Sequence, residues 1–316
     1  MSPSQPPDLI LVNPLAGGGR AGGATNALRK FIRTNHWNAE VVTTADAADL
    51  TRRARAAAAQ GYKRILALGG DGTFQALLNA LASDSDITLG IVPAGGGNDL
   101  AAALGIPPDP IQAAALLRDG EPRLIDAVRV RSASGKERYY AGGGGLGLDA
   151  EAAHLAATTF GRWKGRFRYI AAALRALQHF TPLEVRVTMY SQDWAGPRVL
   201  ESRVLLLGIL NTPSYGAGLR LAPGAKLDDG KLDVLAVADL NLLEILVLLP
   251  ALILFGELRT RRTQRFSITR AHIEAVPPAR FQGDGEIVGM TPLEVEILPH
   301  FIRILAPRRS AEPNSP

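Results

Sequence analysis

The sequence predicts an N-terminal α/β domain with a parallel sheet, followed by a C-terminal β-sandwich domain. In the first third of the chain, short apolar runs alternate with segments of helical spacing. This alternation is typical of a parallel sheet covered by helices on both faces. After residue 122, strand-like runs follow one another between Gly, Pro, Asn and Asp turns, which is typical of a β-sandwich.

The elements of the first part alternate regularly. We expect strands at Leu9–Val12, Glu40–Thr43, Ile65–Leu68 and Leu89–Val92, and helices at Ala24–Asn35, Ala47–Gln60, Phe74–Leu81 and Leu100–Leu104. The first, third and fourth strands each run into a Gly-rich loop. Because ligands of open parallel sheets bind at the carboxyl ends of the strands, three such loops at one edge indicate a ligand site.

The second part is mostly strands. We expect them at Leu124–Arg131, Tyr139–Ala141, Leu183–Tyr190, Arg198–Leu210, Leu232–Val237, Phe266–Thr269, His272–Ala275, around Ile287 and at Leu293–Ile297, with helices at Ala150–Ala157 and Tyr169–Phe180. The turn before residue 123 marks the boundary between a domain at 1–122 and one at 123–297. Residues 308–316 are predicted to be a disordered tail.

Composition excludes several kinds of chemistry. The 316 residues include no cysteine, so disulfides, thiolate metal sites and a cysteine nucleophile are excluded. The five histidines lack metal-ligand spacing, which disfavours a zinc site. A net charge of +5 suits anionic partners. The polar N-terminus does not resemble a signal peptide, and we expect a cytoplasmic protein.

The most informative motif is Gly69-Gly70-Asp71-Gly72-Thr73, which joins an expected strand to an expected helix. Glycines let backbone N–H groups approach a phosphate, and a helix start favours an anion. The carboxylate of Asp71 would repel that anion unless a metal ion or a proton intervenes, and this conflict points to nucleotide phosphates handled with Mg²⁺. The alternative is a turn that serves only tight packing.

Two further loops follow strands. Asn13 and the glycines up to Gly19 follow the first strand, and Gly95, Gly96, Gly97 and Asn98 follow the fourth. Either could hold phosphate through its backbone. The alternatives are an ordinary turn for the first loop, and a helix N-cap role for Asn98 or Asp99 in the other.

Two acidic turns lie in the second half. Asp229-Gly230 reads either as a hairpin turn or as a site for a hard cation, bound by Asp229 and neighbouring carbonyl groups. Asp284-Gly285-Glu286 reads either as an ordinary turn or as the source of a general base for a hydroxyl nucleophile.

Taken together, these motifs resemble the diacylglycerol kinase catalytic-domain family. The shared set is Asn13-Pro14, Gly69–Thr73, Pro93-x-Gly-x-x-Asn98-Asp99, Gly145-x-Gly147-x-Asp149-Ala150, Asn211, Tyr215-Gly216, Ala222-Pro223, Asp229-Gly230-x-Leu232-Asp233 and Asp284-Gly285-Glu286. It covers roughly residues 8–307 in the family's order. The chain looks like the soluble bacterial lipid kinases, which are related to sphingosine and ceramide kinases and more distantly to NAD kinases.

The resemblance implies an NAD-kinase-like α/β domain, with ATP in a cleft between it and the β-sandwich and with residues 298–307 packing back towards the N-terminal domain. It implies nucleotide-binding positions at Asn13, Pro14, Gly17, Gly69, Gly70, Asp71, Gly72, Thr73, Phe74, Gln75, Gly95, Gly96 and Asn98, with Thr43 or Thr44 as a further one. It implies a Mg²⁺ site formed by Asp229 with main-chain oxygens of Lys226 and Lys231, and Asp126 near that ion. By the same resemblance, Glu286 is the first candidate for the proton acceptor, and Asp284 is the second.

Two positions depart from the family pattern. The family usually has Thr where this chain has Gly96, so a hydroxyl contact with the nucleotide is lost. The family also tends to carry an Asn shortly before the Gly-x-Gly-x-Asp segment, where this chain has Ala141 followed by three glycines. Neither change removes the Gly-Gly-Asp-Gly-Thr or Asp-Gly-Glu motif, and we expect an active enzyme.

The function expected from the resemblance is transfer of the γ-phosphoryl group of ATP to a lipid hydroxyl, with diacylglycerol as the first choice. A sphingoid base, phosphatidylglycerol or a soluble polyol stay open as acceptors, as does a nucleotide-binding regulator without catalysis. A Rossmann dehydrogenase is disfavoured because no GxGxxG follows the first strand. Nucleic-acid binding is disfavoured because 6% aromatic residues form no stacking motif.

One apolar segment bears on membrane contact. Leu242–Phe255 has 14 residues and is too short to span a bilayer, which needs about 20. One interpretation is a buried helix or two strand-like pieces. The other is a segment that docks on a membrane surface, because a cationic cluster follows it, formed by Arg259, Arg261, Arg262 and Arg265. We therefore expect peripheral contact with an anionic inner membrane face. The resemblance also implies a homodimer.

Overall fold

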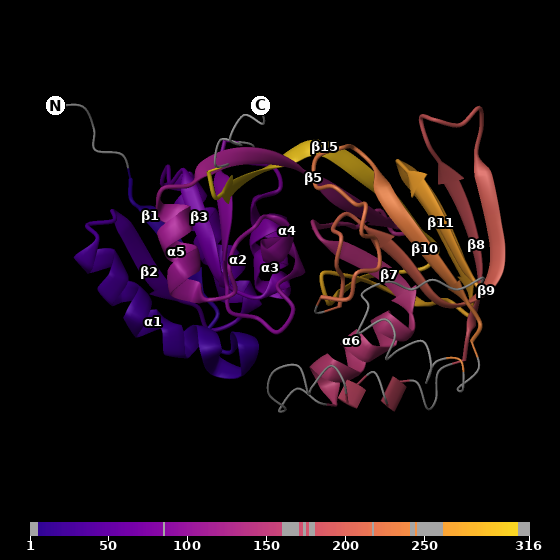
Figure 1. Ribbon diagram of the computed structural model, residues 1–316, viewed down its shortest axis with the longest axis horizontal. Helices are drawn as coiled ribbons and strands as arrows, with labels where there is room; N and C mark the ends of the chain where they lie inside the picture. The colour runs from indigo at the N-terminus through magenta and orange to yellow at the C-terminus, as the bar shows by residue number, and fades with distance from the viewer. Residues whose placement is uncertain are drawn as a thin grey trace, which may run out of the picture. The chain divides into compact units, whose positions relative to one another are not determined.

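The protein is described by a computed structural model, in which residues 6–84, 86–159, 171–172, 175–176, 181–216, 218–240, 244 and 262–308 are placed (Figure 1). The chain divides into two compact units. Unit 1 comprises Met1–Leu124 with Ile302–Pro316, and unit 2 comprises Ile125–Phe301. Strand β15 (Leu293–Ala306) begins in unit 2 and ends in unit 1.

Unit 1 is an α/β unit. Its strands are β1 (Asp8–Val12), β2 (Ala39–Thr43), β3 (Arg64–Gly69) and β4 (Thr88–Pro93), and its helices are α1 (Ala16–Thr34), α2 (Ala47–Ala59), α3 (Asp71–Leu81), α4 (Asp99–Ala103) and α5 (Pro110–Arg118). The four strands pair in parallel in the order β4-β3-β1-β2. The end of β15 extends this sheet, because Ile304 pairs with Leu89 of β4 in parallel.

The strands of this sheet are apolar on both faces. Ile10 and Leu11 of β1 and Ile65 and Leu66 of β3 are fully buried. Alternating apolar side chains point to opposite faces of a strand, so helices must cover both sides. Helix α1 packs against α5, and α2 packs against α3. Right-handed crossovers place α1 on one face and α2 and α3 on the other, because the chain reverses direction along the sheet after β2.

Two helices of unit 1 differ from prediction. The expected first helix began at Ala24, whereas α1 is assigned from Ala16. Gly17, Gly18 and Gly19 have φ values of 62°, 70° and 95°, so regular helix starts only after Gly19. Helix α5 was not predicted, although Asp109 accepts hydrogen bonds from the N–H groups of its first turn and Pro110 starts it. Both are ordinary start signals.

Unit 2 is built from antiparallel strands. They are β5 (Glu121–Ser132), β6 (Glu137–Tyr140), β7 (Gly143–Gly147), β8 (Leu183–Tyr190), β9 (Arg198–Leu210), β10 (Leu232–Ala238), β11 (Thr263–Ile268), β12 (Arg270–Val276), β13 (Arg280–Gly283), β14 (Glu286–Met290) and the first part of β15, together with helix α6 (Leu148–Thr158). The main strand order is β14-β13-β7-β9-β8-β12-β15. Strand β10 pairs with β9 and β11, and β5 pairs with β15 and β6.

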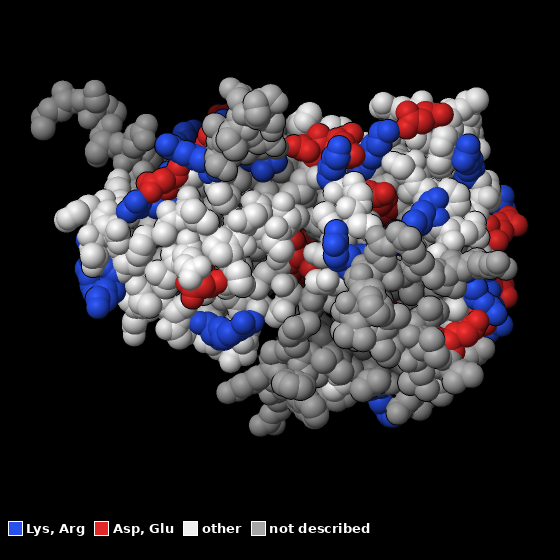
Figure 2. Space-filling model, in the orientation of Figure 1, with Lys and Arg blue, Asp and Glu red and all other residues white. Residues whose placement is uncertain are grey.

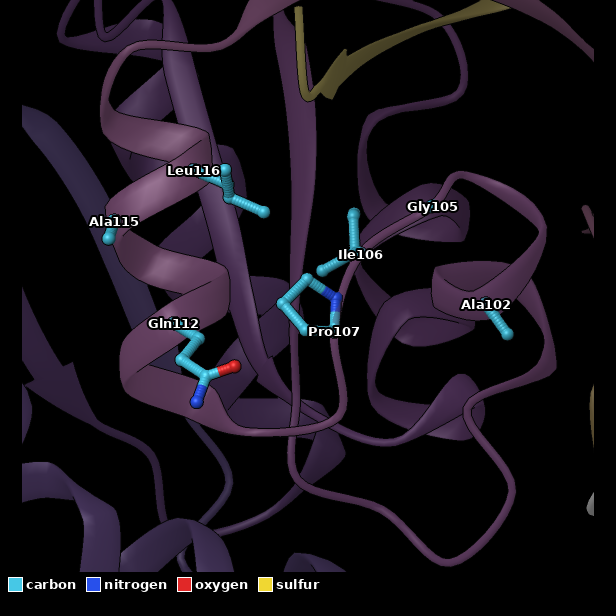
Figure 3. Close-up of a pocket in the computed structure, with 7 residues that line it drawn as sticks. All are labelled: Ala102, Gly105, Ile106, Pro107, Gln112, Ala115 and Leu116. Carbon is cyan, nitrogen blue, oxygen red and sulfur yellow. The ribbon is translucent and has the colours of Figure 1, made fainter.

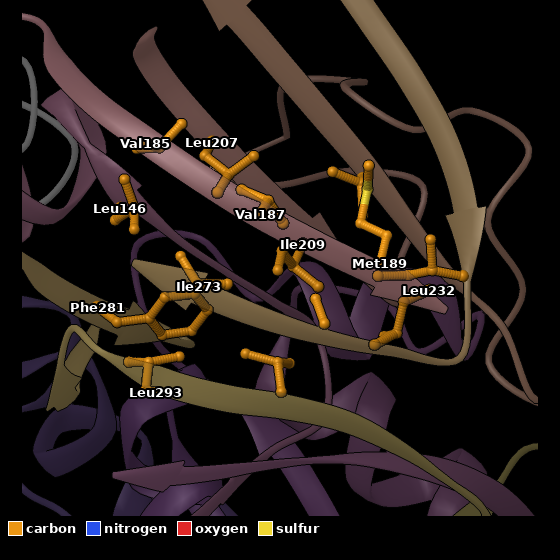
Figure 4. Close-up of a cluster of buried hydrophobic side chains, with 14 of the residues drawn as sticks. Leu146, Val185, Val187, Met189, Leu207, Ile209, Leu232, Ile273, Phe281 and Leu293 are labelled. Atoms are coloured by element: carbon orange, nitrogen blue, oxygen red, sulfur yellow. The ribbon is translucent and has the colours of Figure 1, made fainter. Parts of the chain in front are cut away.

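The core of unit 2 is a cluster of aliphatic side chains around Phe281 (Figure 4). Strand β8 shows how the sequence forms it, because Val185, Val187 and Met189 are buried while Glu184 and Arg186 between them are exposed. This period of two is the pattern of a strand with one buried face. The parallel α/β unit and the antiparallel β-rich unit confirm the predicted fold class.

Strand β7 was missed by sequence reasoning, since a run of glycines has no alternating pattern. The structure shows why glycine is needed there. A Cβ on Gly143 would lie 2.5 Å from Cδ2 of Tyr215, and one on Gly144 would lie 2.8 Å from Cζ of Tyr140. Two aromatic rings therefore occupy the space beside the strand. Strand β13 was also missed.

The last strand is longer than predicted. We expected a strand to Ile297 and then a separate segment, but β15 is assigned continuously to Ala306. His300 within it has a φ of 54°, and its N–H donates to Asp126 at 2.8 Å. Most of the predicted helix Tyr169–Phe180, most of Leu242–Phe255 and the predicted tail from residue 309 to 316 lie outside the described residues.

Candidate functional site

The three Gly-rich loops of unit 1 start at one edge of its sheet. Val12 at the end of β1 is in register with Leu68, and Gly69 at the end of β3 is in register with Pro93 at the end of β4. Neighbouring parallel strands therefore stop at about the same level. The loops that follow them lie together, as expected from the order of strands in the sequence.

The loops after β3 and β4 touch through their backbones. A Cβ on Gly95 would lie 2.4 Å from Cα of Gly70, and one on Gly70 would lie 3.0 Å from Cα of Gly95. A Cβ on Gly69 would lie 2.3 Å from Oγ1 of Thr73. No other residue type has room at these three positions without movement of the chain. Asn13 joins the first loop to this pair, because its Nδ2 donates to Oγ1 of Thr73 at 3.2 Å.

Asp71 binds the loop that follows β4. Its carboxylate accepts from the N–H groups of Asn98 at 2.7 Å and of Asp99 and Leu100 at 3.4 Å. These are the unpaired donors of the first turn of α4, so the capping carboxylate comes from another loop. Asn98 occupies the N-cap position of this helix, as one alternative predicted, although the acceptor for the first turn is the Asp71 carboxylate. The side chain of Asn98 makes no capping bond and instead accepts from Gly95 N–H at 2.9 Å.

The carboxylate of Asp71 is withdrawn from solvent. This desolvation, together with the charge of Asp99, raises the pKa of Asp71 to about 6, although the three backbone N–H groups act in the opposite direction. The sequence pointed to Asp71 as a group that faces a metal or phosphate. The structure gives it a second task, which is to tie the second loop to the third.

Arg20 was not singled out from the sequence. Its guanidinium donates to the carbonyl oxygen of Gly95, and to that of Gly17 at 3.3 Å. A cation therefore lies between the first and third loops, where it would suit a polyphosphate. An arginine directly after three glycines was the signal that could have found it.

The remaining predicted nucleotide positions differ in exposure. Thr43 is exposed at the end of β2, whereas Thr44 is buried and its hydroxyl donates to the carbonyl of Val12 at 2.9 Å. Phe74 is fully buried and Gln75 is 6% exposed. The Phe74 N–H donates to the carbonyl of Gly70, so Phe74 belongs to the base of the loop. Thr43 is thus the more accessible of the two threonines.

The predicted catalytic turn lies in unit 2, between β13 and β14. Asp284 has a φ of 48° and Gly285 one of 86°, both in the left-handed region. The Asp284 carboxylate accepts three backbone hydrogen bonds of 3.0 Å, from Ala141, Gly142 and Gly143. Glu286 follows as the first residue of β14 and is exposed. Asp284 therefore fixes the turn, while Glu286 faces solvent.

The position of the missing family asparagine is served from another segment of the chain. Nδ2 of Asn211 donates to the carbonyl of Ala141 at 2.9 Å and to that of Asp126 at 3.4 Å. An amide is thus present beside the Ala141–Gly144 segment, although the sequence carries none within it.

The predicted metal site rests on a small set of donors. The Asp229 side chain is exposed, and its Oδ1 accepts from the Lys231 N–H at 3.1 Å. Asp126 is buried, and its two carboxylate oxygens accept from Gly230 N–H at 2.7 Å and His300 N–H at 2.8 Å. Over the part of the chain that the structure describes, no three His, Cys, Asp or Glu side chains form a metal-binding group.

The electrostatics nevertheless suit a cation beside Asp229. Burial, with a smaller contribution from the charge of Asp229, raises the pKa of Asp126 and of Asp233. A cation at Asp229 would relieve this repulsion among three carboxylates. Asp126 is buried and already accepts two backbone N–H groups, so the exposed carboxylate of Asp229 is the more accessible of the two to a cation.

The apolar pocket between α4 and α5 lies apart from these residues. It is lined by α4, α5 and the segment between them, including Ile106, Pro107 and Leu116, and none of its lining residues is a predicted site residue (Figure 3). On the displayed face, Lys and Arg are interspersed with Asp and Glu (Figure 2). None of the helices that the structure describes is long and apolar enough to cross a membrane.

The cationic cluster expected beside Leu242–Phe255 is described only in part. Arg262 forms an ion pair of 3.1 Å with Glu244 and donates to the carbonyl of Asp239 at 2.9 Å. Arg265 donates to the carbonyl of Leu221. Arg259 and Arg261 lie outside the described residues. The two described arginines are therefore bound to neighbouring groups of the protein.

The fold defines a class of proteins, which have an NAD-kinase-like α/β unit followed by a β-sandwich. A solved structure of yeast NADH kinase complexed with NADH has a TM-score of 0.52 at 11% identity and covers 97% of this chain and 85% of its own. A solved structure of a diacylglycerol kinase from Bacillus anthracis has a TM-score of 0.68 at 20% identity, covering 96% and 98%. At these identities the likeness concerns the fold.

Sequence comparison gives the family. The model of the diacylglycerol kinase catalytic domain matches residues 7–130, and that of the YegS C-terminal NAD kinase beta sandwich-like domain matches residues 142–306. A diacylglycerol kinase of Mycobacterium tuberculosis is 31% identical over 302 residues, covering 94% of each chain. A diacylglycerol kinase of Bacillus subtilis is 29% identical over 288 residues, covering 90% of this chain and 91% of its own. The chain belongs to the diacylglycerol kinase and YegS-like lipid kinase family.

Proposed function

We propose that the protein transfers the γ-phosphoryl group of ATP to a lipid hydroxyl, most readily that of diacylglycerol, giving phosphatidic acid. The observation that carries this proposal is the contact of the three loops at the sheet edge, with Gly70 against Gly95 and Asp71 bonded to the start of α4. Such a surface of backbone N–H groups and glycines suits phosphates. The names of the relatives support the choice of lipid.

In the proposed reaction, the lipid hydroxyl oxygen bonds to the γ-phosphorus while the bond from that phosphorus to the bridging oxygen breaks, and ADP leaves. The hydroxyl proton passes to Glu286, which is exposed at the start of β14. Asp284 is the second choice for this base, because its carboxylate already accepts three backbone N–H groups. Positioning and electrostatics supply most of the rate enhancement in phosphoryl transfer.

The nucleotide is proposed to lie on the loops of unit 1. The backbone of Gly69–Thr73 and Gly95–Gly96 would hold its phosphates, and Asn13, Thr43 and Asn98 would line the same site. Arg20, whose guanidinium bonds the carbonyl oxygens of Gly17 and Gly95, would add a positive charge. Asp229 with the main-chain oxygens of Lys226 and Lys231 would hold Mg²⁺, and Mg²⁺ bound with ATP would offset the charge of the phosphates.

Peripheral contact with an anionic inner membrane face and homodimer formation belong to the same proposal. The net charge of +5 supports the first, and the family resemblance supports the second. Co-sedimentation with anionic vesicles and light scattering in solution test them separately. Absence of binding to diacylglycerol-containing anionic vesicles would contradict the membrane contact.

The test of function is phosphotransfer from radiolabelled ATP, with Mg²⁺, to diacylglycerol in mixed micelles. Sphingosine, ceramide, phosphatidylglycerol and a polyol such as glycerol serve as competing acceptors, and a lipid-free reaction is the control. We expect labelled phosphatidic acid as the main product. A different labelled acceptor would correct the substrate class. Bound ATP without any labelled product would favour a regulator that does not catalyse.

A further inference from the structure

A chain of hydrogen bonds runs through unit 2 to the turn that carries Glu286. The hydroxyl of Tyr215 and the Nε2 of Gln282 both donate to Oδ2 of Asp149, the latter at 3.1 Å. The other end of the same amide, Oε1 of Gln282, accepts from the N–H of Gly285 at 2.9 Å. Gly285 immediately precedes Glu286. The first turn of α6, the segment after β9, and β13 therefore meet at one carboxylate.

This chain of bonds is shielded from solvent. Gln282 is 2% exposed. The Oδ1 atom of Asp149 is inaccessible and has no hydrogen-bond partner among the residues that the structure describes. A Cβ on Gly145 would lie 3.0 Å from Oδ2 of Asp149, so the Gly-rich strand leaves room for this carboxylate. In such surroundings each hydrogen bond is stronger than in water, and an unpaired group is costly.

The carboxylate decides which way the amide of Gln282 points. An ionised carboxylate can only accept hydrogen bonds, so it requires the NH₂ group of Gln282 on its side. The carbonyl of that amide is then presented to Gly285. The reversed amide would place its oxygen against the carboxylate and its NH₂ against the N–H of Gly285. Both contacts would be repulsive. The charge of Asp149 therefore determines that an oxygen of Gln282 faces the N–H of Gly285.

The turn is held at two successive residues. Asp284 is bound through its side chain to the backbone of Ala141, Gly142 and Gly143, and Gly285 is bound through its N–H to Gln282. The pairing of β13 with β14 shifts register between Phe281 and Gln282, so the regular ladder is interrupted just before the turn. Backbone pairing resumes at Gln282 and Gly283, and the side-chain bonds add to it at the turn.

We propose that Asp149, Tyr215 and Gln282 are positioning residues, which hold Gly285 and thereby aim Glu286. This inference rests on the proposed function, in which Glu286 receives the proton of the lipid hydroxyl. Asp149 sets the direction of the Gln282 amide, Gln282 fixes the N–H of Gly285, and Tyr215 donates to the same Oδ2 atom of Asp149. None of the three needs to touch a substrate.

The inference is tested by reversing the polarity of the chain of bonds. Gln282→Glu keeps the shape and an oxygen for Gly285, but sets a second carboxylate against Asp149. We expect kcat to fall about 10- to 100-fold with the KM for ATP unchanged, because small displacements of a reacting group have effects of this size. In the double variant Gln282→Glu/Asp149→Asn, the amide introduced at position 149 can donate to the carboxylate introduced at position 282. Most of the kcat should then return.

A second measurement does not depend on activity. Hydrogen exchange of the Gly285 amide, followed by NMR, reports the bond to Gln282 directly. We expect faster exchange in Gln282→Met, where both polar ends are lost at similar volume, and restored protection in the double variant. Tyr215→Phe removes only one donor to Asp149, so its effect on Gly285 should be smaller.

A matched control separates positioning from general loss of stability. Ile273→Val removes one methylene group from the core of unit 2 and leaves the hydrogen-bonding groups of Asp149, Tyr215 and Gln282 in place. It should lower the Tm while leaving kcat and the exchange of Gly285 unchanged. ATP binding, measured by calorimetry, should be the same in all of these variants.

The outcomes distinguish the two proposals. A wild-type protein that labels no acceptor would overturn the proposed function, and Gly285 exchange would still judge the hydrogen-bond chain. An active wild type whose Gln282→Met variant keeps its kcat would overturn the positioning role, because that variant has lost both polar ends of the side chain. The role of polarity would be overturned if the kcat of the double variant were lowered by the product of the factors measured for Gln282→Glu and Asp149→Asn alone, because no rescue would have occurred.

Discussion

In unit 1 the loop after β3 lies against the loop after β4 through direct backbone contact, whereas in unit 2 side-chain hydrogen bonds add to the strand pairing that holds the turn before β14. Gly70 and Gly95 approach so closely that neither has room for a Cβ. Asp284 instead reaches three N–H groups with its carboxylate, and Gln282 reaches Gly285. A surface of backbone N–H groups suits phosphate groups, whose shape and charge are the same in every nucleotide. A turn held by side chains can set the orientation of a single side chain.

The difference also predicts which substitutions each region tolerates. The backbone contacts of unit 1 should be sensitive to added volume and indifferent to polarity. The hydrogen-bonded turn of unit 2 should be sensitive to polarity at constant volume. Asp71 is the exception in unit 1, since its side chain joins two loops by hydrogen bonds.

The largest effect is expected at this exception. Asp71→Ala should abolish turnover in a protein that remains folded, because three N–H groups at the start of α4 lose their acceptor and the loops separate. Phosphotransfer to diacylglycerol and circular dichroism of the same preparation check this. Asp71→Asn is the control, since it keeps an acceptor oxygen. Activity of the Ala variant near that of the wild type would contradict the role of Asp71.

The next effect is expected at the proposed proton acceptor. Glu286→Gln should lower kcat by about 10²–10⁴-fold, which is the usual contribution of a general base, and leave ATP affinity unchanged. Steady-state kinetics and calorimetry measure the two quantities. Asp284→Asn made in parallel decides between the carboxylates: a larger loss at Asp284, with Glu286→Gln near normal, would assign the base to Asp284.

A smaller effect is expected from added volume in unit 1. Gly95→Ala places a Cβ 2.4 Å from Cα of Gly70. Overpacking of this kind costs about 1–3 kcal/mol, so ATP affinity should fall about 10- to 100-fold if the loops must separate. Gly23→Ala is the matched control, because a Cβ there meets nothing within 4 Å. Equal ATP affinity of the two variants would contradict backbone contact as the basis of the site.

The sequence predicted the elements whose pattern is local. The strands Leu183–Tyr190 and Arg198–Leu210 were predicted at their observed bounds. In the first, apolar residues alternate with polar ones, and in the second a run of branched apolar residues is bounded by turn residues. The three loops and the Asp-Gly-Glu turn were found because glycine and acidic residues stand at strand ends. These signals are carried by neighbouring residues in the chain.

The contacts that were missed join residues far apart in sequence. The acceptor for the first turn of α4 is Asp71, 27 residues before Asn98. The glycines of β7 carry no pattern of their own, because the space beside Gly143 and Gly144 is taken by the rings of Tyr215 and Tyr140, which are distant in the chain or on another strand. The amide beside Ala141 comes from Asn211, 70 residues later. Such partners follow from the fold, and no local spacing could have given them.

The last prediction concerns the hydrogen-bond chain of unit 2 under changing pH. Desolvation of its carboxylate raises the pKa of Asp149 from its ordinary value of 3.8 to about 6, despite the hydrogen bond from Tyr215. The native protein therefore binds this proton more tightly than the unfolded chain does. The resulting stabilisation is fully present below pH 3.8 and is lost as the pH rises through about 6.

Wild type and Asp149→Asn should consequently differ in their pH dependence. As the pH falls from 7 to 4, the free energy of unfolding of the wild type should rise relative to that of Asp149→Asn by at most about 3 kcal/mol. Urea unfolding at each pH measures the difference. Asp193→Asn, at an exposed carboxylate of the same unit, controls for the loss of one charge. A difference between wild type and Asp149→Asn that stays constant with pH would mean that Asp149 is hydrated in solution, and its carboxylate would then be free to turn away from Gln282.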